Sequence, residues 1–230
     1  TYEFCEIPEF SLAEGFYDSF IEISLSVESG NQQIYYSLDG SIPDENSLIY
    51  NEPIYVDETT IIRAATINPT CPPEAVITKT YFLTEISNLP TVSLITDPYN
   101  LWDDEYGIYV MGNNASSDFP YFGANFWEDW ERPIHVEFFE PTGELGFSIN
   151  AGVKIFGNYS RGLPQKSLAI YARSEYGDNG IDYQIFPDKD IDSFKSFVLR
   201  NSGNDWFGED QYYASMFRDG MNTGLMDGTG

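Results

Sequence analysis

Residues 34–43, with the sequence IYYSLDGSIP, decide how the N-terminal part of the chain folds. The stretch begins with β-branched and aromatic side chains, which are typical of a strand. The pair Asp39-Gly40 then favours a turn, because glycine tolerates positive φ and an aspartate side chain hydrogen-bonds the backbone that follows it. The stretch therefore predicts a strand that ends in a tight turn.

Strand patterns continue on both sides of this stretch. Between Phe20 and Val27, apolar and polar residues alternate, which is the period of a strand with one solvated face. Three more segments are rich in β-branched and aromatic residues and are separated by Gly, Pro, Asn and Asp: residues 53–56, 59–67 and 75–83. This spacing predicts a compact antiparallel β-sandwich.

The same part of the chain resembles a known module. The resemblance is carried by residues 14–17, 34–43, Tyr50, 53–54 and 60–64. Together they resemble the chitobiase/β-hexosaminidase C-terminal module, over nearly all of residues 6–83. The resemblance implies an Ig-like fold and an accessory role without catalysis.

Three tyrosines of this module leave two interpretations open. Tyr35, Tyr36 and Tyr50 can form a platform on which a sugar stacks, or they can pack in the core and across strands. Packing is the commoner use of aromatic residues on a sandwich strand. A polysaccharide is therefore the secondary prediction for a partner of this module.

Length and charge bound the class of protein. The chain has 230 residues, more than one small sandwich needs, so we expect two domains, at residues 1–86 and 87–230. The boundary falls where strand periodicity is lost and Pro90 follows. The net charge of −26 repels phosphate backbones, which excludes nucleic acid as an expected partner. No stretch approaches the roughly 20 apolar residues of a transmembrane segment.

Cys5 and Cys71 are the two cysteines of the chain, and they lie near the two ends of the N-terminal module. A disulfide between them fits an oxidising compartment, and two buried free thiols are the alternative. The pairing is consistent with an extracellular or cell-surface location.

An acidic turn follows the module and is a candidate calcium site. Asp97, Asp103 and Asp104 supply carboxylates, the hard oxygen ligands that Ca²⁺ prefers. Their spacing lacks the glycine and distal glutamate of an EF-hand. His135, the one histidine, lies in a predicted strand without a neighbouring nucleophile, so we expect a packed or cross-strand side chain rather than a catalytic base.

A predicted hairpin carries the candidate chemistry of the C-terminal part. Two strands, at residues 152–157 and 166–173, flank a loop that contains Ser160, Arg161 and Gly162. A flexible loop of this kind can present N–H groups to a phosphate, with Lys166 just behind as a positive charge. The alternative is an ordinary hairpin with a solvated lysine.

A second resemblance covers the chain from about Leu89 to its end. It rests on the order of several segments rather than on any one of them: residues 137–139, 144–147, 151–154, 160–162, 164–168, 186–189, 199–205 and 217–219. In this order they resemble the CotH family of atypical, spore-coat-type protein kinases. Beside the sandwich, this implies an α+β, partial kinase-like domain in a mostly β chain.

The kinase resemblance implies roles for the hairpin. It makes Lys166 the candidate residue that pairs with the phosphates of ATP, and it makes Ser160 and Arg161 candidate contacts from the loop to the nucleotide. Gln165 stands where many relatives have a second basic residue. ATP with Mg²⁺ or Mn²⁺ is the expected cofactor, and the metal-binding and catalytic acids are expected C-terminal to Gly230. We therefore expect residues 1–230 alone to be inactive.

The residues around the hairpin extend this prediction. A polar cluster of Arg200, Asn201, Asn204 and Asp205 follows a predicted strand, and a helix is predicted from Glu209 to Met226. The sequence thus predicts a secreted or cell-surface protein that phosphorylates other surface or secreted proteins. The alternative is a non-catalytic adhesion or carbohydrate-binding protein that uses both domains as binding modules.

Overall fold

The computed structural model describes residues 5–28, 32–68, 75–83 and 88–201. The chain forms two compact units. The first unit comprises Thr1–Pro98 and Ile134–Asn150, and the second comprises Tyr99–Pro133 and Ala151–Gly230. The domain boundary predicted between residues 86 and 87 separates modules of the sequence rather than these compact units, and it stays a prediction. The helix predicted at residues 209–226 lies outside the described part of the chain.

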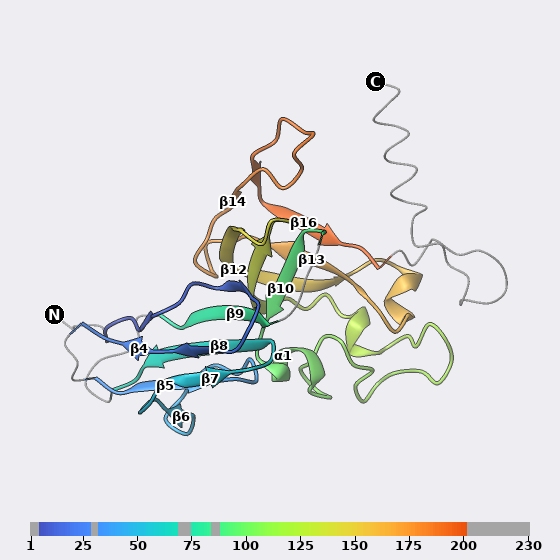
Figure 1. The fold of residues 1–230 in the computed structure, drawn as a ribbon. Helices are drawn as coiled ribbons and strands as arrows, with labels where there is room; N and C mark the ends of the chain where they lie inside the picture. The colour runs from blue at the N-terminus through green and yellow to red at the C-terminus, as the bar shows by residue number, and fades with distance from the viewer. Residues whose placement is uncertain (1–4, 29–31, 69–74, 84–87, 202–230) are drawn as a thin grey trace. The chain divides into compact units, whose positions relative to one another are not determined.

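The first unit is a β-sandwich (Figure 1). Its larger sheet has the order β2 (Gly15–Tyr17), β9 (Ile77–Leu83), β8 (Thr60–Thr66), β5 (Ile34–Ser37) and β6 (Leu48–Ile49). Strand β2 runs parallel to β9, and the other neighbours are antiparallel. Two further antiparallel pairs are β3 (Ile21–Ile23) with β7 (Ile54–Val56), and β1 (Glu9–Phe10) with β4 (Leu25–Ser26).

The core of this unit forms because each strand turns its apolar positions inward. Buried side chains from the larger sheet, the β3–β7 pair and β4 share one cluster: Ile23, Leu25, Ile34, Ile54, Val56, Ile62, Ala64, Tyr81 and Leu83. Tyr36 and Tyr50 pack against this cluster while partly buried, which favours the packing interpretation for these two tyrosines. The mostly β fold with an Ig-like antiparallel sandwich is confirmed.

The first unit continues beyond the sandwich strands. Strand β10 (Thr91–Ile95) pairs antiparallel with β11 (Arg132–Phe139), so that Ser93 lies opposite Glu137 and Ile95 opposite His135. The hydroxyls of Thr80 and Ser93 are 2.7 Å apart and hydrogen-bonded. Phe139 is fully buried and meets Phe16 and Phe82 edge-on. Residues predicted to lie in different domains thus share this unit.

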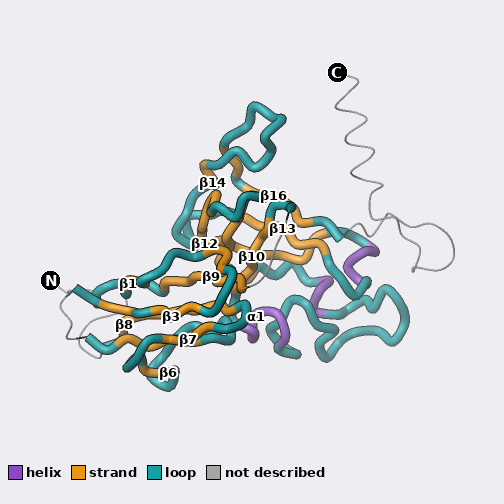
Figure 2. The backbone as a smooth tube through the Cα atoms, in the orientation of Figure 1, coloured by secondary structure: helices purple, strands orange, loops and turns teal. Residues whose placement is uncertain are grey.

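The second unit contains the predicted hairpin. In strand β12 (Leu145–Phe156), the residues from Gly152 to Phe156 pair with β13 (Ser167–Tyr171), and β13 in turn pairs with β16 (Ser196–Leu199). Strands β14 (Ile181–Asp182) and β15 (Ser193–Phe194) form a small separate pair. Figure 2 shows that helix in the described part is confined to short turns: α1 (Pro98–Trp102), η1 (Asn125–Trp127) and η2 (Tyr159–Gly162). None of these is long and apolar enough to cross a membrane.

Cys5 is fully buried and disulfide-bonded, so it is not a free thiol. Cys71, the other cysteine of the chain, lies outside the described residues.

The predicted Asp39-Gly40 turn is present. Gly40 has a φ of +84°, and the Asp39 carboxylate accepts hydrogen bonds from the backbone N–H and the hydroxyl of Ser41, at 3.0 and 2.5 Å. A Cβ on Gly40 would lie 2.9 Å from the carbonyl oxygen of Thr96. This position therefore requires glycine for both its conformation and its space.

Replacing Gly40 by alanine is expected to destabilise the protein by about 2 kcal/mol, because the new Cβ adds a clash to an unfavourable backbone conformation. Urea unfolding of the wild type and the variant measures the difference. Gly177→Ala is the matched control, since Gly177 also has positive φ but nothing within 4 Å of its Cβ position. Equal losses in the two variants would contradict the role given to the Thr96 contact.

Candidate functional site

The loop that joins β12 to β13 is the candidate site, and Arg161 holds it in place. Gly157, at the end of β12, has a φ of +114°. The Arg161 Nε donates to the Gly157 carbonyl at 2.8 Å, while its Nη1 donates to the carbonyls of Phe126 and Trp127 at 3.4 and 3.2 Å. Arg161 thereby ties the loop to itself and to η1.

Lys166 is buried behind this loop, with 8% of its surface exposed. Its Nζ donates to the carbonyls of Arg161 and Leu163, at 2.8 and 2.9 Å. The same nitrogen lies 3.8 Å from the centre of the Phe126 ring and 5.2 Å from that of Tyr109. The alternative of a solvated lysine is therefore wrong.

Among the described residues, the charge of Lys166 is contacted by backbone carbonyls and aromatic rings. No ion pair of Lys166 occurs within the described ranges of the chain. Burial lowers the pKa of Lys166 to about 8, because the ammonium form loses its hydration. The arrangement is thus a buried cation that lacks an anionic partner among the described residues.

Ser160 lies on a different part of the loop from the Lys166 ammonium. It lines a cavity of about 120 Å³ together with Phe156, Gly157, Asn158, Tyr159, Ser167, Arg200 and Asn201. The Ser167 hydroxyl is 2.9 Å from the Asn201 Oδ1 and accepts the Asn201 backbone N–H at 3.0 Å. Sequence reasoning did not single out Ser167 as a site residue, although it directly follows Lys166.

The predicted calcium ligands have other contacts. Asp97, in the first unit, lies 3.5 Å from the Ile42 N–H that donates to it. In the second unit, the Asp103 carboxylate caps a turn by accepting the N–H groups of Glu105 and Tyr106, at 2.9 and 2.8 Å. The backbone carbonyl of Asp104 accepts a hydrogen bond from Asn125. Within residues 5–28, 32–68, 75–83 and 88–201, no three acidic, His or Cys side chains are placed to hold a metal ion.

His135 is a packed cross-strand side chain, as predicted. It is 9% exposed, and its Nδ1 and Nε2 lie 2.9 and 3.0 Å from the Asn150 Oδ1 and the Ser148 Oγ on β12. Both ring nitrogens are therefore engaged by polar side chains, which agrees with a structural role.

Glu137 is a buried acid that sequence reasoning did not single out. It is fully buried, and its Oε1 accepts the Thr80 N–H at 3.4 Å. Among the residues that the structure describes, its Oε2 has no hydrogen-bond partner. Burial raises the pKa of the Glu137 carboxyl to about 7, and the nearby Glu14 carboxylate adds to the rise. The sequence signal was a carboxylate between Val136 and Phe138, in a strand whose neighbouring residues are apolar.

Comparison with known protein families supports the N-terminal module. Residues 12–78 match the family model described as "Chitobiase/beta-hexosaminidase C-terminal domain", which confirms the predicted Ig-like module in the first unit. No curated protein matches the chain. The CotH resemblance of the remaining residues stays a prediction.

The raised pKa of Glu137 predicts how stability depends on pH. An unfolded glutamate titrates near pH 4.3, whereas folded Glu137 titrates at about 7. Between these values the folded chain keeps a proton that the unfolded chain releases, so the contribution of Glu137 to stability falls as pH rises through this window. Glu137→Gln should remove this fall, which is on the order of 2 kcal/mol.

Urea unfolding at pH 5 and at pH 8 measures the effect as the difference between the wild type and the variant. Glu144→Gln, at an exposed position of the same unit, is the control for the loss of one carboxylate. If the wild type and Glu137→Gln lose the same stability between these pH values, Glu137 does not titrate in this window.

Proposed function

We propose that the chain is the N-terminal portion of a secreted or cell-surface CotH-type atypical protein kinase, which uses ATP with Mg²⁺ or Mn²⁺ to phosphorylate extracellular or surface proteins. The observation that carries the proposal is the Lys166 ammonium, buried without an anionic partner in the described part of the chain. The Ig-like module is then an accessory unit beside the nucleotide-binding one.

Lys166 has one N–H donor that a phosphate oxygen could accept. An ammonium has three N–H donors, and two of them meet the carbonyls of Arg161 and Leu163. A buried charge is costly unless it is paired, and a phosphate would supply the missing negative charge. This supports the role of Lys166 as the lysine that pairs with nucleotide phosphates.

Arg161 and Ser160 take different roles in this proposal. Three hydrogen bonds from Arg161 go to backbone carbonyls, so this residue positions the loop before any ligand binds. Ser160 faces the cavity of about 120 Å³. Ligand pockets usually measure roughly 300–1,000 Å³, so this cavity is too small for a whole nucleotide. Its lining includes Ser160 but not Lys166, so the two residues would contact different groups of a ligand. The nucleoside would bind to parts of the protein outside the described residues.

Thermal unfolding of the full-length protein with ATP tests the proposal. With Mg²⁺ or Mn²⁺ present, ATP at about 100 times its Kd should stabilise the wild type by about 2.7 kcal/mol. Lys166→Met should abolish this gain. The control is Lys154→Met, because Lys154 already pairs with Asp129. A wild type that ATP leaves unchanged would rule out nucleotide binding.

The lowered pKa of Lys166 also predicts how ATP affinity depends on pH. Below about pH 8 the side chain is charged and pairs with phosphate; above this pH the free protein loses the charge, so affinity should fall by up to tenfold per pH unit. Lys166→Arg should show a weaker dependence, since arginine stays charged. Calorimetric titration from pH 7 to 9.5 measures both, and identical slopes would contradict titration of Lys166.

The second candidate function is a non-catalytic surface or adhesion protein, including one that binds carbohydrate. It is favoured by the hydrogen bonds that Arg161 and Lys166 donate to backbone carbonyls of the loop and of η1, because these bonds hold both side chains in place without a ligand. Incubation with labelled ATP and surface proteins separates the two functions. Phosphate transfer that is lost in Lys166→Met supports the kinase, and its absence in the wild type supports the binding protein.

A further inference from the structure

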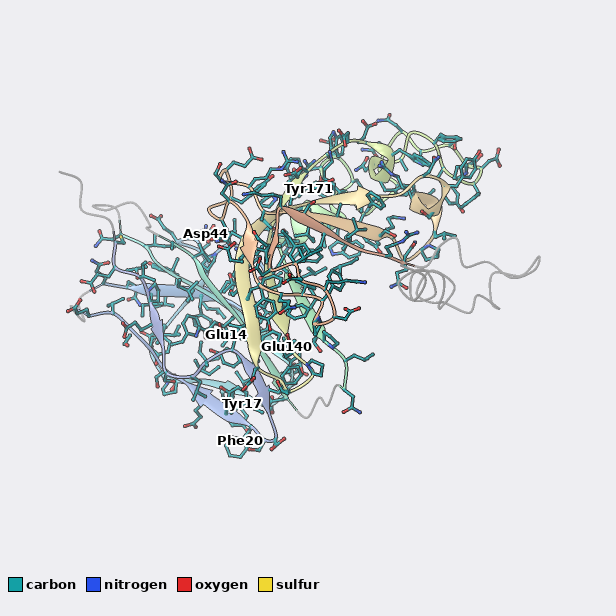
Figure 3. All side chains as sticks on the ribbon, turned by 90° about the horizontal axis from the view of Figure 1, so that it is seen from above. Glu14, Tyr17, Phe20, Asp44, Glu140 and Tyr171 are labelled. Atoms are coloured by element: carbon teal, nitrogen blue, oxygen red, sulfur yellow. The ribbon has the colours of Figure 1, made fainter. Side chains whose placement is uncertain are left out.

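The β3–β7 pair of the first unit carries two exposed aromatic rings on its outer face. Its inner residues are buried in the core, whereas Phe20 and Tyr55 are 60% and 55% exposed. Their ring centroids are 5.4 Å apart with a tilt of 31°. Phe20 lies at the surface of the unit in Figure 3. A solvated sheet face usually carries polar side chains, so this ring pair is unlike the rest of its face.

Two carboxylates share this face with the rings. Glu22 lies directly opposite Tyr55 in the antiparallel register, so their side chains point to the same side. Asp57 lies two positions after Tyr55, at the residue that directly follows β7. Both acids are exposed, and neither forms an ion pair within the described ranges.

The segments of sequence around the rings carry only negative charges. No Lys, Arg or His occurs in the sequence before Arg63, whereas the segments around the rings also carry Asp18, Glu52 and Glu58. Carboxylates without counter-charges attract cations, and the faces of aromatic rings attract them too. The rings and the acids therefore favour the same kind of partner.

We propose that Phe20, Tyr55, Glu22 and Asp57 form a docking surface for a Lys- or Arg-bearing segment of another protein. Cationic side chains lie over the rings, and their charges pair with the two carboxylates. The rings and acids come from β3, β7 and the residues that directly flank them, so they engage more than one cationic group at a time. This surface belongs to the Ig-like module and is independent of the proposed nucleotide site in the second unit.

A fluorescent peptide of eight arginines tests the proposal, with the full 230-residue chain and fluorescence anisotropy at 0.15 M salt. Phe20→Ser/Tyr55→Ser keeps every charge of the protein, and it should weaken binding by about tenfold because cation–π contacts are lost. Glu22→Gln/Asp57→Asn should also weaken binding and make it less sensitive to salt. Circular dichroism checks that both variants remain folded.

The control is Glu9→Gln/Glu28→Gln, which removes the same charge at exposed positions elsewhere in the first unit. It should change binding less than twofold. If Phe20→Ser/Tyr55→Ser binds the peptide like the wild type, the attraction comes from the net charge of −26 alone and the docking surface is wrong. If the wild type instead binds neutral oligosaccharides through the two rings and does not bind the peptide, the partner is a glycan and the proposal is overturned.

Discussion

The burial of apolar side chains between the larger sheet and the β3–β7 pair is the constraint on which the first unit depends. The side chains of Ile23 and Ile62 are completely shielded from solvent, and so is that of Tyr81, whose hydroxyl donates to the Leu12 carbonyl. Strands β7, β8 and β9 each supply this core with two residues that are two positions apart. The outer face is thereby set as well: once Ile54 and Val56 point inward, Tyr55 must point outward.

Alternation explains which parts of the fold the sequence could predict. The apolar periods at residues 20–27 and 53–56 correspond to strands that were found close to their expected positions. The edge strand β6 was not predicted, since Leu48 and Ile49 are both exposed and show no period of two. The parallel pairing of β2 with β9 was not predicted either, because register between segments distant in sequence depends on tertiary packing.

The candidate site shows the same limit of prediction from sequence, which does not reveal contacts between distant segments. The sequence indicated that Lys166 lies at the base of a hairpin loop, because strand patterns flank it on both sides. It could not indicate that the ammonium turns back to its own loop and packs on Phe126, a residue 40 positions earlier in the chain. Arg161 was predicted as a ligand contact, but its donors meet carbonyls of η1, which follows from tertiary contacts alone.

Lys166 and Glu137 together show how burial separates a candidate site from a structural group. Both lose hydration, and the pKa of each moves toward its neutral form, down to about 8 for Lys166 and up to about 7 for Glu137. Below about pH 7 Glu137 becomes neutral by keeping a proton, and in that form it needs no counter-charge. Lys166 remains largely charged at pH 7, and its carbonyl contacts stabilise that charge without neutralising it. A buried group that keeps its charge at working pH attracts an opposite charge, and this distinguishes Lys166 as the anion-binding candidate.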